Sequence, residues 1–277
     1  MAHDRGVSEA EPFYLPLDPD PRDPGTGLFH ATYSTTGPWF ADAQHAGPPS
    51  ALLVRAMEQR PQPDPEVPLS LARVTTEVLG RIPAGDVEVR AQVLRPGRRI
   101  ELLQAEMLAG GRMVLQARGW RFAPADTSEV VVGTAPAIAG PEDAVLQDAR
   151  PEGWLPGFMD MIEWRWLSGA LGEPGPGRAW VRQRVPLVAG EEPSPLQRLV
   201  VAADSANGIA APLDLRSWLF VNTELSLHVH RAPVGEWIGV DAATVIGPSG
   251  AGTVSAVLHD AAGHTGRATQ ALTVGPR

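Results

Sequence analysis

A single carboxylate interrupts a small, apolar stretch of the sequence. Asp204 lies within VVAADSANGIAA, residues 200–211, whose composition predicts a buried helix. Burying an unpaired carboxylate costs several kcal/mol, so Asp204 needs either a partner or a chemical role. The structural interpretation is a carboxylate satisfied by a helix terminus or by Arg216. The chemical interpretation is a general base, because burial raises the pKa of a carboxyl group toward neutral pH.

A histidine and a glycine precede a second predicted helix, in QHAGPPSALLVRAME, residues 44–58. A glycine at a helix start lets a substrate carbonyl approach backbone N–H groups whose dipoles point outward. Because Pro48–Pro49 cannot donate, the amides of Gly47 and Ser50 remain as candidates to hold an oxyanion. The alternative is an ordinary helix N-terminus with proline in its first turn.

Composition excludes several classes of protein. The chain has 277 residues, of which 43% are hydrophobic, and carries a net charge of −9. Its 23 basic residues are scattered, so a nucleic-acid partner is not expected. There is no cysteine, which removes disulfides, thiolate zinc sites and cysteine nucleophiles. His228 and His230 have the spacing of metal ligands on a strand but lack a third ligand, so we expect neither a metal nor a cofactor.

From the sequence we expect no targeting signal. The first 20 residues contain no apolar core of leader-peptide length, and no run approaches the about 18 apolar residues of a membrane span. We therefore expect a cytoplasmic protein without a membrane partner.

The chain divides near its middle. Residues 125–153 are rich in Ala, Pro, Gly and acidic residues and lack periodicity, as in a linker. We expect one unit at 1–124 and a second at 154–277. Both have an aromatic opening, a helical stretch and several alternating stretches typical of strands.

The two units align with each other. RIPAGDVEV, which begins at Arg81, matches RAPVGEWIGV, which begins at Arg231, and the offset of 150 places Pro83 on Pro233. A later pair of stretches matches at an offset of 152. Two copies of one unit is the simplest explanation.

A duplicated unit with one helix and a meander of long strands resembles the double hot-dog acyl-CoA thioesterases, specifically the bacterial acyl-CoA thioesterase II-like group. The residues 44–58 resemble that family's His-Gly-Gly segment, with Ala46 where many relatives have glycine. The resemblance implies an α+β fold with two tandem repeats, each a long antiparallel sheet wrapped around a central helix. It also implies that His45, Gly47 and Ser50 contact the substrate.

The resemblance implies one active site per chain. In single-copy relatives, the His-Gly loop of one subunit faces the acid on the helix of the other. At the offset of 150, Asp204 aligns with Val54 and His45 with Pro195, so each copy keeps what the other lacks. We expect His45 to face Asp204, and the related position at Val54 and Pro195–Gln197 to be inactive.

The thioesterase II relatives use an Asp, a Thr and a Gln to hold a water molecule. Gln270 matches the family's Gln, and its first-repeat counterpart at the offset of 152 is Arg118. Spacing places the family's Thr on Asn222, and a one-residue slip places it on Thr223. A slip of one turns the side chain to the other face of a strand, so only one of them can line the site. We keep both and favour Asn222.

The expected reaction is hydrolysis of an acyl-CoA, or less readily of an acyl carrier protein thioester, by a water activated at Asp204. No acyl-enzyme is required, and the oxyanion would rest near Gly47. Arg98, Arg99 and Arg231 are candidates for coenzyme A phosphates, although solvated turn arginines are the simpler interpretation. The alternative function is a non-catalytic acyl-binding protein. Family habit favours a homodimer or higher homo-oligomer.

Overall fold

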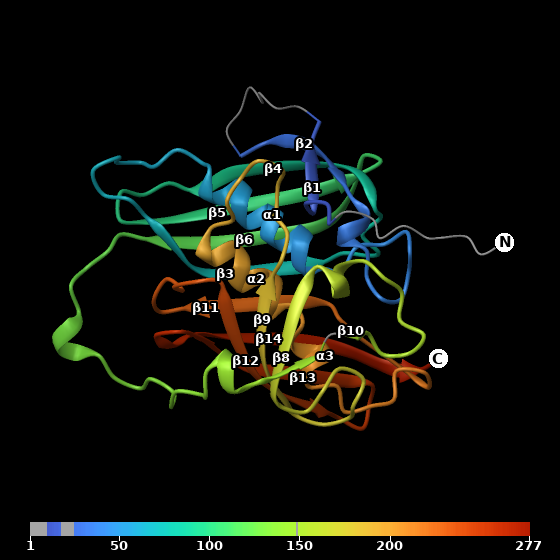
Figure 1. The fold of residues 1–277 in the computed structure, drawn as a ribbon. Helices are drawn as coiled ribbons and strands as arrows, with labels where there is room; N and C mark the ends of the chain where they lie inside the picture. Colours follow the sequence, from blue (N-terminus) through green and yellow to red (C-terminus); the bar gives the residue numbers. More distant parts are fainter. Residues whose placement is uncertain (1–9, 18–24, 148) are drawn as a thin grey trace.

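The computed structural model describes residues 10–17, 25–147 and 149–277. The amino-terminal stretch in which no leader is expected lies largely outside these residues. In the described part of the chain, the strands form one antiparallel sheet of 14 strands. Its order is β1-β2-β4-β5-β6-β3-β11-β14-β13-β12-β9-β8-β7, and β10 also pairs with β14. Figure 1 shows the first half of the chain above the second.

The first half contributes one helix and six strands. These are β1 (Tyr14–Pro16), β2 (Gly27–Ala31), α1 (Gly47–Glu58), β3 (Ser70–Val78), β4 (Gly85–Arg95), β5 (Ile100–Ala109) and β6 (Arg112–Phe122), with the short 3-10 helix η1 (Tyr33–Thr35). The alternating stretches that predicted strands between residues 70 and 122 are confirmed. Their buried residues face α1, which packs against β3 to β6.

The second half contributes the remaining strands and two helices. These are β7 (Val145–Gln147), β8 (Ile162–Ser168), β9 (Gly177–Gln183), α2 (Pro195–Ala203), α3 (Ala206–Ile209), β10 (Trp218–Asn222), β11 (Glu224–Val229), β12 (Trp237–Ile246), β13 (Ala251–Asp260) and β14 (Gly263–Pro276), with 3-10 helices η2 (Ser128–Val130), η3 (Pro141–Asp143) and η4 (Phe158–Asp160).

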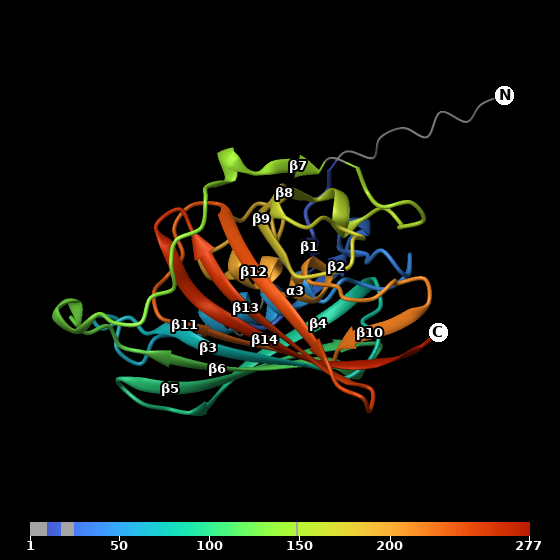
Figure 2. The same ribbon diagram turned by 90° about the horizontal axis from the view of Figure 1, so that it is seen from below.

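The strand order is the same on the two sides of the β3–β11 pair. Outward from that pair, one side runs β3, β6, β5, β4, β2, and the other runs β11, β14, β13, β12, β9. Along the chain, α1 comes after β2 and α2 comes after β9, which are the outermost strands of these two series. Figure 2 shows the strands following one another as a curved layer, with the helices on its inner side. The two central helices α1 and α2 therefore pack against each other inside the curve.

Two predicted elements are interrupted in the structure. The stretch expected as one helix ends at Asp204, which is the C-cap of α2, and a separate short helix, α3, follows. The alternating stretch SWLFVNTELSLHVHR, residues 217–231, indicates one strand in the sequence but is split at Thr223 into β10 and β11. Both strands pair with β14, but their registers differ by one residue. This is a β-bulge, which changes the face that the following side chains occupy.

The segment expected as a linker is partly ordered against the second half. Its strand β7 pairs with β8. The indole nitrogen of Trp180 donates to the carbonyl of Ala139 at 2.7 Å, and the amide of Ala135 donates to Nδ1 of His264 at 3.0 Å. The segment therefore covers part of the second half in addition to connecting the two units.

Candidate active site

Asp204 is buried at the junction of α2 and α3, with 3% of its surface exposed. Its Oδ1 atom accepts a hydrogen bond from Nδ2 of Asn222 at 2.9 Å. Its Oδ2 atom lies 3.1 Å from Nδ1 of His45. Arg216, the structural partner considered above, instead pairs with Asp214. The partners of the Asp204 carboxylate are therefore side chains from the two halves of the chain.

His45 reaches Asp204 from the loop that leads into α1. Its ring stacks on Phe158 at the start of η4, with ring centroids 3.9 Å apart and planes within 10°. The amide of Gly47 donates to Nδ1 of the ring at 3.2 Å. A Cβ atom at Gly47 would lie 3.0 Å from the carbonyl oxygen of Val201, so glycine lets α1 start close against α2. The close helix packing thus holds the imidazole against the carboxylate.

The amide of Gln270 bonds to the backbone of the α2–α3 junction. Its Nε2 atom donates to the carbonyl of Asp204 at 3.0 Å, and its Oε1 atom accepts from the amide of Asn207 at 3.1 Å. In a continuous helix these groups would bond within the helix. Here both groups bond to the side chain of Gln270 instead, which lies on β14 and is 1% exposed. These bonds stabilise the break in the helix at Asp204.

The bulge at Thr223 decides which of the two neighbouring polar residues faces Asp204. Asn222 is the last residue of β10 and points inward to the carboxylate. The Thr223 side chain is exposed, and its hydroxyl donates to the carbonyl of Ala271 at 3.3 Å. Of the two positions that spacing left open, the structure thus places Asn222 at Asp204.

The two amides expected to hold an oxyanion differ in their partners. The Ser50 amide donates to the carbonyl of Ala46 at 3.1 Å within α1, so the expectation of a free donor there is wrong. The Ser50 hydroxyl is buried without a hydrogen-bond partner. The Gly47 amide points toward His45 and Asp204 and has no partner within the helix. Gly47 alone remains as a backbone donor at this helix start, because prolines follow it.

Burial dominates the electrostatics of the Asp204–His45 pair. Burial raises the pKa of Asp204, against the opposing effects of His45, the Asn222 hydrogen bond and the Gly47 amide. Burial also lowers the pKa of His45, against the opposing effect of Asp204. The Gly47 amide lies against both groups, so it can donate to Nδ1 of His45 or to the Asp204 carboxylate. Burial of both groups favours a neutral pair that can take up negative charge by losing one proton.

The opposite end of the α1–α2 pair is arranged differently. Val54, which aligns with Asp204, is also buried. One turn further on, Glu58 accepts hydrogen bonds from the Ser194 hydroxyl at 2.9 Å and from Nε2 of Gln197 at 2.7 Å. Burial raises the pKa of Glu58, whereas these hydrogen bonds lower it. Ser194 also caps α2 by accepting from the Gln197 amide, so this carboxylate links the two helices.

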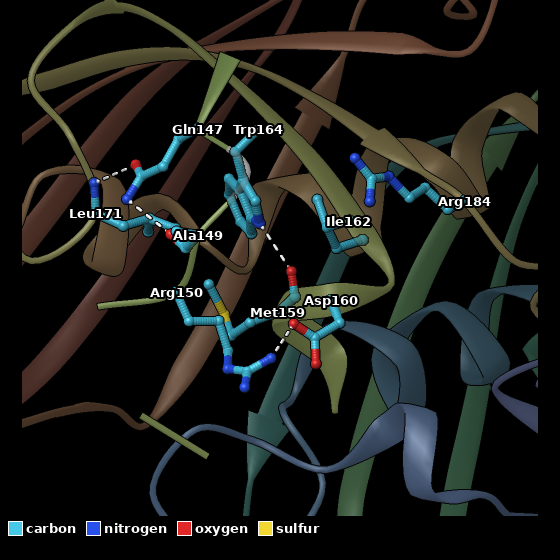
Figure 3. Close-up of a pocket in the computed structure, with 9 residues that line it drawn as sticks. All are labelled: Gln147, Ala149, Arg150, Met159, Asp160, Ile162, Trp164, Leu171 and Arg184. Carbon is cyan, nitrogen blue, oxygen red and sulfur yellow. Dashed lines mark hydrogen bonds and ion pairs between the residues drawn. The ribbon is translucent and has the colours of Figure 1, made fainter. Parts of the chain in front are cut away.

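Two hollows in the surface lie beside β7, away from the Asp204 site. The smaller, of about 80 Å³, is bordered by η4 and β8 (Figure 3). There Arg150 pairs with Asp160, and the indole nitrogen of Trp164 donates to the carbonyl of Met159 at 3.2 Å. Small-molecule pockets usually measure about 300–1,000 Å³. The larger, of about 640 Å³, is an open depression along β7. Neither is lined by His45, Asp204 or Asn222, so we do not assign them to the substrate.

Sequence reasoning missed Phe158. The residue is fully buried and lies 113 positions after His45, in a segment whose only visible signal is its aromatic composition. Its contact with the imidazole becomes apparent only when η4 is placed beside the loop before α1, through the bond from the Phe158 amide to the carbonyl of Thr36 at 2.9 Å.

No helix in the described residues is both long and apolar enough to cross a membrane. Within the same residues, no group of three or more His, Cys, Asp or Glu side chains is arranged to hold a metal ion.

Solved structures similar to this one share the hot-dog fold. A candidate thioesterase from Novosphingobium aromaticivorans aligns with a TM-score of 0.72 at 18% identity, covering 95% of this chain and 99% of its own. A candidate thioesterase II from Thermobifida fusca aligns with a TM-score of 0.72 at 16% identity, covering 98% and 100%. A hot-dog protein from Alicyclobacillus acidocaldarius aligns with a TM-score of 0.69 at 13% identity, covering 90% and 93%. Among curated proteins, none matches the sequence.

The family follows from the sequence match. Residues 35–122 match the acyl-CoA thioesterase N-terminal domain, and residues 141–274 match the acyl-CoA thioesterase C-terminal domain. Together these ranges span most of the chain. The chain belongs to the acyl-CoA thioesterase family and is a thioester hydrolase. The non-catalytic alternative is therefore not retained.

Proposed function

We propose that the protein hydrolyses an acyl-CoA thioester by direct attack of a water molecule at one site per chain, built around Asp204. The observation that carries this proposal is the buried contact between Asp204 and His45, which joins α2 of the second half to the loop before α1 of the first. Asn222 completes the arrangement from β10. Buried titratable groups with shifted pKa values and specific partners often mark a functional site, which supports a chemical role for this cluster.

Exposure suggests the side from which water approaches. The His45 side chain is 18% exposed, whereas that of Asp204 is 3% exposed. The substrate and water would therefore meet the pair from the imidazole side. The amide of Gly47, at the same helix start, is the backbone donor best placed for an oxyanion. Gln270 acts through the backbone, because its amide is already bonded at the α2–α3 junction.

In the proposed reaction, the ionised pair accepts one proton from water as the water oxygen bonds to the thioester carbon. The resulting tetrahedral oxyanion collapses with cleavage of the carbon–sulfur bond. The pair returns its proton to the leaving thiolate, which gives the carboxylic acid and the free thiol. Because the pair shares a proton, its titration belongs to both groups together.

A duplicated hot-dog unit supports a single site. The identical strand order of the halves and the repeated position of the helix support a double hot-dog. At the position related to Asp204 the chain has Val54, and Glu58 nearby is bonded to α2. The homodimer or larger assembly stays a prediction.

The test is thiol release from short-, medium- and long-chain acyl-CoAs by the wild type and Asp204→Asn. We expect the variant to lose at least about a hundredfold in kcat, as removal of a general base does. Asp214→Asn, which removes an exposed carboxylate paired with Arg216, is the matched control and should keep full activity. Equal activity of Asp204→Asn and wild type would exclude the proposed role.

A further inference from the structure

Three tryptophans stand a short distance before elements of the proposed site. Trp39 lies six residues before His45, and Trp218 begins the strand β10 that ends at Asn222. Trp154 lies four residues before η4, whose first residue stacks on the His45 ring. The segments that supply His45, Phe158 and Asn222 therefore each carry an indole a few residues earlier.

Contacts of Arg277 and Trp39 connect these three segments: Arg277 contacts the Trp39 ring and the backbone of Trp218, and the Trp39 ring contacts that of Trp154. The rings of Trp39 and Trp154 have centroids 4.9 Å apart and are inclined by 59°. The guanidinium of Arg277 lies over the Trp39 ring, 5.6 Å from its centroid, and its Nε atom donates to the carbonyl of Trp218 at 3.4 Å. Trp39 is 41% exposed and Trp218 is 40% exposed. We name Trp39, Trp154, Trp218 and Arg277 the tryptophan cluster.

Arg277 differs from two of the arginines considered above for coenzyme A phosphates. Within the described residues, no carboxylate forms an ion pair with Arg277. By contrast, Arg98 pairs with Asp64, and Arg231 pairs with Asp260. These two were candidates for coenzyme A phosphates; the third candidate, Arg99, forms no ion pair among the described residues. Arg277 keeps its charge available to an anion beside exposed aromatic faces.

We propose that the tryptophan cluster binds the adenine nucleotide of a coenzyme A thioester, an inference that rests on the proposed function. A purine ring stacks on indole faces, and a guanidinium pairs with phosphate oxygens. From Trp218 to Asn222, β10 spans about 13 Å at the usual rise per residue. A pantetheine arm can bridge such a length to bring the thioester to Asp204. An acyl carrier protein has the arm without the nucleotide, so the cluster would favour coenzyme A.

The test compares an acyl-CoA with the same acyl group on N-acetylcysteamine, which lacks the nucleotide. In Trp39→Leu and in Arg277→Gln we expect KM for the acyl-CoA to rise by at least about fivefold, as loss of a stacking or phosphate contact produces. KM for the truncated thioester should stay unchanged. Because the truncated substrate reports the intact site in the same preparation, misfolding would affect both substrates and is recognised as such.

The control is Trp237→Leu, since Trp237 also has guanidinium groups over its ring, from Arg182 at 4.8 Å and Arg165 at 5.1 Å. It contacts none of the site residues, and its variant should keep the wild-type ratio of the two KM values. An unchanged ratio in both Trp39→Leu and Arg277→Gln would overturn the inference.

A second measurement separates this inference from the proposed function. Tryptophan fluorescence is titrated with adenosine 3′,5′-bisphosphate in the wild type and in Arg277→Gln. Saturable quenching in the wild type that weakens in the variant supports the nucleotide site even if no thioester is hydrolysed. Absence of quenching in the wild type counts against the cluster, whatever the hydrolytic activity.

Discussion

The Nδ1 atom of His45 lies 3.1 Å from the Oδ2 atom of Asp204, although the two residues are 159 positions apart and belong to different halves of the chain. The contact depends on the close approach of α1 and α2, which Gly47 allows. A carboxylate and an imidazole that share a proton in an apolar core form a unit whose charge state is sensitive to each neighbour. Single substitutions of those neighbours should therefore have separate, measurable effects.

Asn222→Leu should move the acid limb of the kcat/KM profile to higher pH. Burial raises the pKa of Asp204, and the Asn222 hydrogen bond opposes this by stabilising the carboxylate. Without that bond the ionised form is less stable, so activity is lost at a higher pH as the solution is acidified. The measurement is kcat/KM across the pH range for the wild type and the variant.

Thr223→Val is the control for that prediction. It alters the adjacent side chain, which is exposed and bonded to Ala271 instead of Asp204. The profile of this variant should coincide with that of the wild type. A shift in Thr223→Val with none in Asn222→Leu would mean that the bulge places the other residue at the site.

Phe158→Leu should lower kcat by misplacing the His45 ring. The parallel stack at 3.9 Å restrains the imidazole, and stacking of aromatic rings contributes about 0.5–1.5 kcal/mol. A branched aliphatic side chain fills part of the volume but leaves the ring free to rotate. The measurements are kcat, the pH profile and the free energy of unfolding.

Phe13→Leu is the matched core control. Phe13 is also fully buried, and its ring lies 6.0 Å from that of Phe158. Each variant should lose about 1–3 kcal/mol of stability. Only Phe158→Leu should change kcat and the pH profile. If both variants behave alike in every measurement, Phe158 is a packing residue only.

Glu58→Gln should leave activity unchanged, since Glu58 links the helices at the position without a site. Burial raises the pKa of Glu58 above its ordinary value of 4.5. A raised pKa means that the folded protein binds the proton more tightly than the unfolded chain does. Protonation of Glu58 therefore stabilises the fold at low pH, and this contribution is lost as pH rises from about 4.5 through the folded pKa.

Denaturant unfolding at several pH values tests this contribution of Glu58 protonation to stability. The wild type should gain stability relative to Glu58→Gln as pH falls from neutral toward 4.5, because glutamine does not titrate. A constant difference would show that the folded and unfolded states bind this proton equally. A halving of kcat in Glu58→Gln would contradict the single-site proposal.

Local patterns in the sequence predicted much of the fold. Alternating stretches located the strands of both halves, and proline in the first turn located the start of α1. The helix break at Asp204 could not be predicted locally, because its cause is the side chain of Gln270 on a strand 66 positions later. The bulge at Thr223 was also hidden, since the register of two strands on β14 depends on the pairing partner.

The sequence by itself determined which residues are available: one carboxylate in an apolar run, a His-Gly segment before a helix, and an internal alignment that predicts a different part of the proposed site in each half. The tertiary structure decided which of them meet. It placed Asn222 on Asp204 instead of Thr223, engaged the Ser50 amide within α1, and brought Phe158 and the tryptophan cluster into position. Composition and spacing act along the chain, whereas a hydrogen bond or a ring stack requires atoms within a few ångströms, and only folding fixes those distances.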